Sequence, residues 1–314
     1  MIQIQFAARS LRWAEYEAPL RAALDAHGLD YRMENYTQDA SLPPESVDYI
    51  VYAPNSHLQD FTAYTRCKAV LNLWAGVEGI TGNRTLTQPL ARMVDHGLTQ
   101  GMVEWVVGHA MRLHLGMDIH LNGQDGIWRR HVPPLAEDRP VTILGLGALG
   151  TACGTALAQL GFPVRGWSRS PKDVPGITCL SGPDGLAQAL AGAGIVVLLL
   201  PLTDATENTL NAATLQHLAP GAFVLNPGRG PLIDDTALLA ALDAGGVAQA
   251  TLDVFREEPL PPDHPYWAHP NVTVTPHIAS ETRASSAAKV IAENIRRGEA
   301  GEPFLHLVNR DAGY

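Results

Sequence analysis

The chain has 314 residues, of which 46% are hydrophobic, and a formal net charge of −10 at pH 7, so it is long enough for two domains. The acidic balance argues against nonspecific binding to nucleic acid or to an anionic membrane surface. The three scattered cysteines do not form a disulfide framework or a zinc knuckle and are typical of a reducing compartment. Residues 1–6 alternate like a strand and do not resemble a secretory signal. We therefore expect a soluble cytoplasmic protein that binds no metal, no nucleic acid and no membrane.

The first 98 residues alternate short apolar runs with a helical stretch, which predicts a small α/β domain with a parallel sheet. The helix is expected over 15–27 and ends before Gly28, a favourable cap. Strands are expected at 2–6, 30–35, 49–52 and 70–73.

Residues 102–118 carry apolar side chains near helical spacing and predict a long helix. From Val141 the alternation of strands and helices restarts, and six strands with intervening helices are typical of a doubly wound dinucleotide-binding sheet. The expected strands are 141–144, 163–167, 195–200, 222–226, 248–252 and 272–275, and the expected helices are 149–160, 184–191, 211–218, 234–243 and 281–297.

The last helix is followed by a tail that we expect to return to the first domain. The chain is therefore predicted to be an α/β protein of two Rossmann or flavodoxin-like parallel-sheet domains. The dinucleotide-binding domain, residues 99–284, is inserted into a substrate domain made of residues 1–98 and 285–314.

A glycine-rich loop follows the expected strand 141–144 and opens a helix. In such a loop Gly145 allows a tight turn, Gly147 lets the backbone approach a pyrophosphate, and Gly150 lets strand and helix pack closely. Ala148 and Leu149 open the helix, whose free N–H groups favour phosphate. An ordinary strand-to-helix turn is the alternative for this pattern.

The end of the second strand of this domain indicates which dinucleotide is bound. An NAD-preferring site places an acidic residue here for the ribose 2′-hydroxyl, whereas this chain has Ser168, Arg169 and Ser170. A carboxylate at about 4 Å would repel a phosphate charge by roughly 4 kcal/mol, while an arginine fork matches phosphate oxygens. We therefore expect NADPH, although a solvated loop arginine is the alternative for Arg169.

Three expected strand ends carry the residue types that carbonyl reduction needs. Arg229 follows one strand, Glu257 and Glu258 follow the next, and His277 follows the last. A histidine delivers a proton near neutral pH, a carboxylate orients it, and an arginine grips a substrate carboxylate. Each residue alone could be structural, and spacing does not choose between Glu257 and Glu258.

At these residues the chain resembles the NAD(P)-dependent D-2-hydroxyacid dehydrogenases, most closely the glyoxylate/hydroxypyruvate reductase A branch of that family. The resemblance covers nearly the whole chain. Its most specific pieces are residues 226–230, 252–260 with Pro261 and Pro262 following, 273–277, and the tail 308–314.

The resemblance implies the role of each reactive residue. Arg229 would bind the 2-oxo acid, and His277 would contact it as the general acid of reduction. Glu258, the acidic residue directly before Pro259, would be the partner of His277, which decides against Glu257.

The resemblance extends to a loop of the first domain whose backbone N–H groups hold the substrate carboxylate. Its residues here are Trp74, Ala75, Gly76 and Val77. A tight strand-end turn is compatible with that role. Trp74 would line the pocket or, equally well, lie in the core or in a dimer contact.

For the cofactor, the resemblance implies that Asp253 faces the nicotinamide carboxamide, and Ala279 is also expected to bind the cofactor. One departure is Pro227 before Gly228, because proline has no backbone donor and a nicotinamide contact through that N–H is not expected. The adenosine side would be lined by Pro201, Leu202 and Thr203.

Together these features predict an NADPH-preferring reductase that converts small 2-oxo acids such as glyoxylate and hydroxypyruvate to glycolate and D-glycerate. An NAD-dependent dehydrogenase of another D-2-hydroxy acid and a non-catalytic NAD(P)-sensing regulator are the alternatives. The resemblance also implies a homodimer joined through the dinucleotide domains.

Overall fold

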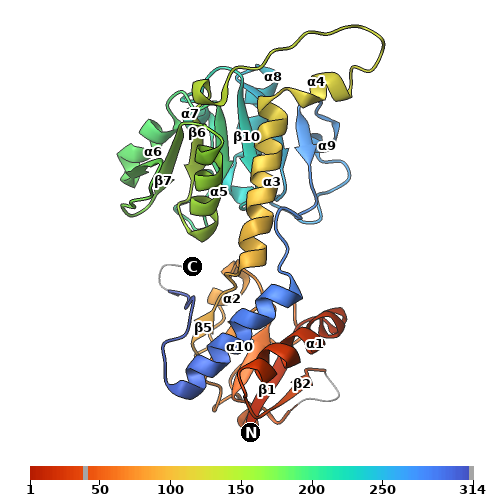
Figure 1. Ribbon diagram of the computed structural model, residues 1–314, viewed down its shortest axis with the longest axis vertical. Coiled ribbons are helices and arrows are strands. Elements are labelled where there is room, and N and C mark those ends of the chain that lie inside the picture. Colours follow the sequence, from red (N-terminus) through yellow and green to blue (C-terminus); the bar gives the residue numbers. More distant parts are fainter. Residues whose placement is uncertain (38–41, 311–314) are drawn as a thin grey trace. The chain divides into compact units, whose positions relative to one another are not determined.

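The computed structural model describes residues 1–37 and 42–310 (Figure 1). By its internal contacts the chain divides into two compact units. Unit 1 consists of Met1–Leu98 with Thr282–Tyr314, and unit 2 consists of Thr99–Glu281. The second boundary therefore follows Glu281, whereas the sequence placed it after residue 284.

Unit 1 is built on a five-stranded parallel sheet with the order β2-β1-β3-β4-β5, the flavodoxin-like order. Every residue of β3 and β4 is buried, as expected for a parallel sheet covered on both faces. Ile291 and Ile295 of α10 share a core with Ile4 and Leu71, so the last helix packs on the sheet begun by the first residues. The elements are β1 (Ile2–Ala7), α1 (Ser10–Ala26), β2 (Tyr31–Asn35), η1 (Pro44–Ser46), β3 (Tyr49–Tyr52), β4 (Ala69–Asn72), α2 (Glu78–Thr81), β5 (Leu90–Ala91) and α10 (Ala284–Ala300).

Unit 2 is built on a seven-stranded parallel sheet with the order β12-β11-β10-β9-β6-β7-β8. Read from β8, this is the strand order of a dinucleotide-binding sheet with one extra strand, β12, at the other edge. The direction in which the order runs along the chain reverses between β6 and β9. Figure 1 shows α3 and α5 against one face of this sheet. The strands are β6 (Val141–Leu144), β7 (Val164–Ser168), β8 (Ile177–Ser181), β9 (Ile195–Leu198), β10 (Ala222–Asn226), β11 (Val247–Leu252) and β12 (Val272–Val274). The helices are α3 (His96–His114), α4 (Met117–Leu121), η2 (Ala136–Asp138), α5 (Ala148–Gln159), α6 (Gly182–Leu190), α7 (Ala212–Leu215), η3 (Gly230–Leu232), α8 (Asp235–Asp243) and α9 (Pro265–Ala268).

The two-domain parallel-sheet fold predicted from the sequence is confirmed, but some details are wrong. The sheet of unit 1 has a fifth strand, β5, which the sequence did not predict because it has only two residues. The sheet of unit 2 has seven strands and not six, because the edge strand β8 buries only Ile177 and lacks the continuous apolar pattern of the others. The helix predicted over 102–118 is two helices, because Gly116 adopts a left-handed φ of 61° between α3 and α4.

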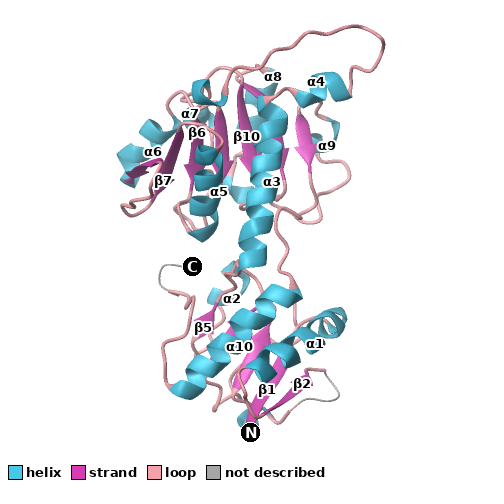
Figure 2. Ribbon diagram, in the orientation of Figure 1, coloured by secondary structure: helices cyan, strands magenta, loops and turns pink. Residues whose placement is uncertain are grey.

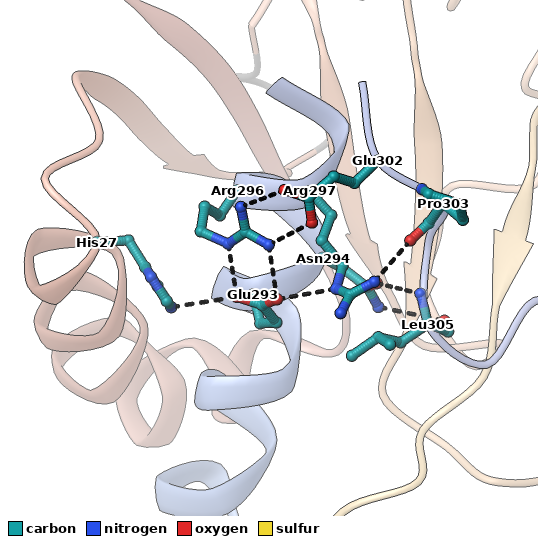
Figure 3. Close-up of polar contacts among 8 residues, drawn as sticks. All are labelled: His27, Glu293, Asn294, Arg296, Arg297, Glu302, Pro303 and Leu305. Atoms are coloured by element: carbon teal, nitrogen blue, oxygen red, sulfur yellow. Dashed lines mark hydrogen bonds and ion pairs between the residues drawn. The ribbon is translucent and has the colours of Figure 1, made fainter. Parts of the chain in front are cut away.

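Polar contacts tie the segment that follows α10 back to that helix (Figure 3). Asn294 is 1% exposed and its Oδ1 accepts from the backbone N–H of Leu305 at 2.7 Å. Glu293 accepts from Arg296 and Arg297, each at 2.8 Å, and the Arg296 hydrogen bond is the main reason that the pKa of this carboxyl is lowered to about 2. The last four residues of the tail that resembles the family, 311–314, lie outside the described residues.

No helix in the described part of the chain combines the length and the apolar character needed to cross a bilayer.

Candidate active site

The glycine loop joins β6 to α5 beside the point where the strand order reverses. A Cβ on Gly150 would lie 1.8 Å from the Gly145 carbonyl oxygen, and one on Gly145 would lie 2.5 Å from the Leu199 carbonyl oxygen. Gly145 also has a φ of +109°, so both positions require glycine. A Cβ on Gly147 would meet nothing within 4 Å. The loop therefore packs tightly at Gly145 and Gly150, whereas the space beside Gly147 is open. Ala148 begins α5, whose N-terminal N–H groups can bind phosphate.

The strand ends next to the glycine loop carry the other residues predicted for the cofactor. Ser168 ends β7, is buried, and donates its hydroxyl to the Ser170 carbonyl oxygen at 2.8 Å. Arg169 and Ser170 are exposed. After β9, the Thr206 hydroxyl accepts from the backbone N–H of Thr203 at 2.8 Å and donates to the Pro201 carbonyl oxygen at 2.7 Å, which holds the turn containing Leu202.

His277 and Glu258 are in direct contact. His277 Nδ1 lies 2.7 Å from Glu258 Oε2, and Glu258 Oε1 accepts from the backbone N–H of Phe255 at 2.9 Å. Nδ1–H donates to the carboxylate, and this hydrogen bond orients the imidazole. Nε2 is then the ring nitrogen that does not contact Glu258. His277 is 53% exposed and adopts a positive φ of 54°, a strained conformation of a kind that persists at functional sites. Glu257 is exposed.

Each partner shifts the pKa of the other. The hydrogen bond to Glu258 is the largest cause that raises the pKa of His277 above 6.5, and it outweighs burial and the Arg229 charge, which lower it. Burial raises the pKa of Glu258, but the hydrogen bonds from His277 and Phe255 and the Arg229 charge together leave it below the ordinary value. The pair therefore favours an imidazolium beside a carboxylate.

Arg229 follows β10 within the electrostatic reach of this pair, since its charge lowers the pKa of both His277 and Glu258. It is held in extended backbone between two glycines. A Cβ on Gly228 would lie 2.7 Å from the Leu198 carbonyl oxygen, and one on Gly230 would lie 2.0 Å from the Phe255 carbonyl carbon. Close packing around the two glycines thus positions Arg229.

Asp253 organises the loop that carries His277. Its side chain is completely buried, and its two oxygens accept from the Thr275 hydroxyl at 2.5 Å and from the backbone N–H groups of Ile278 and Ala279 at 2.9 and 2.8 Å. The predicted contact of Asp253 with a nicotinamide stays a prediction. Its contact with the loop is what the structure shows.

The remaining predicted residues differ in how far they are buried. Pro227 is buried between β10 and Gly228. In unit 1, the loop after β4 contains Trp74, which is 41% exposed, and Val77, which is 2% exposed. Ala75 and Gly76 between them are partly buried.

Residues 108–279 match the family model for the D-isomer specific 2-hydroxyacid dehydrogenase NAD binding domain. The chain belongs to the D-isomer specific 2-hydroxyacid dehydrogenases. It is therefore an NAD(P)H-dependent oxidoreductase, and the predicted family is confirmed.

Curated relatives of this dehydrogenase include glyoxylate/hydroxypyruvate reductase A of Yersinia enterocolitica, 37% identical over 279 residues that cover 86% of this chain and 88% of the relative. A solved D-isomer specific 2-hydroxyacid dehydrogenase from Xanthobacter autotrophicus Py2, in complex with NADPH and MES, is 40% identical with a TM-score of 0.92 and 99% coverage of each chain. An NADPH-dependent glyoxylate/hydroxypyruvate reductase from Sinorhizobium meliloti, in complex with NADP and sulfate, is 31% identical with a TM-score of 0.89 and full coverage of both chains.

Three groups in the site of this dehydrogenase were not singled out from the sequence. Thr275 and Asn226 are polar residues at strand ends, a position that could have drawn attention to them. Phe255 takes part through its backbone N–H, which no side-chain pattern signals.

Proposed function

We propose that this dehydrogenase is an NADPH-preferring reductase of glyoxylate and hydroxypyruvate, which it converts to glycolate and D-glycerate. The observation that carries the proposal is the 2.7 Å contact between His277 and Glu258 within the field of Arg229. The names of the reductases from Yersinia enterocolitica and Sinorhizobium meliloti support the substrate class. The cofactors bound to the two solved relatives support NADPH.

The chain's own residues fit a phosphorylated dinucleotide. The glycine loop leaves open space at Gly147, and β7 ends at Ser168 and is followed by Arg169, without a carboxylate at either position. The bound cofactor supplies a hydride. We assign to its binding Gly145, Gly147, Ala148, Leu149, Gly150, Ser168, Arg169, Ser170, Pro201, Leu202, Thr203, Pro227, Gly228, Asp253 and Ala279.

In the proposed reaction His277 delivers a proton from Nε2 to the carbonyl oxygen of the substrate. Glu258 keeps the imidazole oriented and stabilises its charged form through Nδ1. Arg229 binds the 2-oxo acid and stabilises negative charge on its oxygens. The N–H groups of the loop 74–77 bind the substrate carboxylate.

An assay of purified protein with each 2-oxo acid and either NADPH or NADH tests this function through the absorbance of the reduced nicotinamide. We expect turnover of both acids, with a higher kcat/KM for NADPH. Turnover with NADH alone and another 2-oxo acid would support the NAD-dependent alternative. Tight NADPH binding without turnover of any 2-oxo acid would support a regulator.

Replacement of His277 by alanine tests the acid role separately. We expect His277→Ala to lower kcat by about 10²–10⁴-fold and to leave NADPH binding nearly unchanged. His269→Ala is a matched control, because His269 also faces a carboxylate, with Nε2 at 3.4 Å from Asp243 Oδ1. Turnover of His277→Ala at the rate of that control would rule out the acid assignment.

We also propose that the protein is a cytoplasmic homodimer joined through unit 2. The loop after α4, which Figure 2 shows arching away from the sheet, exposes several large apolar side chains. Large apolar side chains exposed together on one segment mark interaction surfaces, and a second copy would cover them symmetrically. The three free cysteines support a reducing compartment. The exposed side chains are Leu121 at 65%, at the end of α4, and in the loop Ile127 at 63%, Trp128 at 97%, Val132 at 71% and Leu135 at 67%.

A further inference from the structure

A buried asparagine lies beneath the loop that we propose to bind the substrate carboxylate. Asn72 is the last residue of β4 and is 1% exposed. Its Nδ2 donates to the carbonyl oxygens of Trp74 at 2.9 Å and of Gly76 at 3.2 Å. One side-chain amide therefore holds two carbonyl groups of the loop on its inner side.

These hydrogen bonds, together with the one that the Trp74 carbonyl oxygen accepts from the Met93 N–H at 3.0 Å, fix where two N–H groups of the loop point. In a trans peptide group the C=O and the following N–H lie on opposite sides. Because the carbonyl groups of Trp74 and Gly76 point at Asn72, the N–H groups of Ala75 and Val77 point away from it. Neither N–H donates to an acceptor among the residues that the structure describes. Two backbone N–H groups of one loop that point outward and have no acceptor among the described residues can bind an anion.

The side-chain amide of Asn72 is paired on one side only. Its Oδ1 is buried and accepts no hydrogen bond from the described residues. The opposite orientation of the amide would place Oδ1 against two carbonyl oxygens, so the observed one is the favourable choice. Both donors of this amide are thus directed to one loop at the carboxyl end of a parallel strand, where ligands of such sheets bind.

The sheet of unit 2 repeats this arrangement. Asn226 is the last residue of β10 and is also 1% exposed. Its Nδ2 donates to the Arg229 carbonyl oxygen at 2.9 Å, and its Oδ1 accepts from the Gly228 N–H at 3.2 Å. In each unit, a strand-terminal asparagine holds the backbone of a loop assigned to the substrate.

We propose that Asn72 is a positioning residue, which directs the N–H groups of Ala75 and Val77 toward the carboxylate of the 2-oxo acid. It acts through the loop and does not contact the substrate. The inference rests on the proposed function, because that function supplies the carboxylate. Loss of Asn72 therefore weakens substrate binding and leaves cofactor binding unchanged.

Two substitutions test the proposal. Asn72→Ala removes both donors, and we expect it to raise the KM for glyoxylate by about tenfold or more, with a smaller change in kcat and an unchanged Kd for NADPH. Asn72→Asp nearly preserves the shape but replaces the donor with an acceptor beneath the anion site. We expect it to raise the KM further than Asn72→Ala does.

Asn294→Ala is the matched control (Figure 3). Asn294 is an equally buried asparagine of unit 1 that bonds to loop backbone, but at Leu305 and not at the loop 74–77. Thermal unfolding of each variant reports stability. If either Asn72 variant is folded and has the same KM for glyoxylate as Asn294→Ala, the positioning role is refuted.

Binding of oxalate to the NADPH complex, measured by calorimetry, separates this inference from the proposed function. If the wild type binds oxalate but reduces no 2-oxo acid, the proposed function fails. In that case, weaker oxalate binding by Asn72→Asp than by Asn294→Ala still supports the positioning role. If the wild type neither binds oxalate nor turns over glyoxylate, both proposals fail.

Discussion

At the scale of single residues, the contact between His277 Nδ1 and Glu258 Oε2 sets the protonation of the proposed acid. The hydrogen bond to the carboxylate raises the pKa of His277 above 6.5. Reduction needs the imidazolium, so the rate of reduction is highest at pH values below the raised pKa of His277. That rate falls as the pH rises through this pKa. Oxidation of the hydroxy acid needs the neutral imidazole and has the opposite dependence.

Glu258→Gln removes the main cause that raises the pKa of His277, while burial and the Arg229 charge continue to lower it. We expect the pH at which reductive kcat/KM falls to move downward, with a lower rate at neutral pH. A pH–rate profile of kcat/KM for glyoxylate measures the shift. Glu257→Gln is the control, because Glu257 is exposed and was the alternative on spacing alone. A larger effect from Glu257→Gln would reverse the assignment.

The cofactor preference is also a residue-scale property. Arg169 is exposed after β7, next to Ser168, where the sequence predicts that an NAD site would carry a carboxylate. We expect Arg169→Ala to raise the KM for NADPH by about 10–100-fold, the loss of a charge-assisted contact, and to leave the KM for NADH nearly unchanged. Arg169→Lys should recover part of the loss, because it keeps the charge. Equal changes for both cofactors would exclude a contact with the 2′-phosphate.

At the scale of elements, parallel strands bring the reactive residues together by ending at one edge of a sheet. β10, β11 and β12 are neighbours, and they are followed by Arg229, Glu258 and His277. Buried polar groups then fix the loops. Asp253 binds the loop of His277, and Asn226 binds the loop of Arg229.

The glycine loop provides a prediction at this scale, since its glycines have different surroundings. A methyl group on Gly150 would meet the Gly145 carbonyl oxygen at 1.8 Å, so we expect Gly150→Ala to lower the free energy of unfolding by about 3 kcal/mol or more. Gly147→Ala meets nothing within 4 Å and should be as stable as the wild type, but should raise the KM for NADPH. Chemical denaturation and initial rates measure the two effects. Normal NADPH binding by Gly147→Ala would contradict the assignment of this loop to the pyrophosphate.

At the scale of the whole molecule, the exposed loop after α4 predicts the oligomeric state. We expect the wild type to have twice the chain mass of 33.7 kDa in light scattering coupled to size exclusion, and Trp128→Glu to shift the protein toward the monomer. Trp267→Glu is the matched control, because Trp267 is a 52% exposed tryptophan of α9 outside that loop. A monomeric wild type, or equal dissociation by both variants, would rule out this interface.

The sequence by itself determined the fold class, the glycine loop and the strand ends that carry the reactive residues. Apolar periodicity and glycine are local signals, and they are strong where a strand is buried on both faces, as β3 and β6 are. β8 was missed because an edge strand needs no continuous apolar run, and only its pairing with β7 makes it a strand. Spacing left Glu257 and Glu258 equal, and the resemblance alone chose Glu258. The tertiary structure shows the contact with His277 itself, because β11 and β12 pair in a register that brings two distant loops within hydrogen-bond distance. The role of Asn72 likewise became visible only through its contacts, since its place at a strand end does not say which backbone groups it holds.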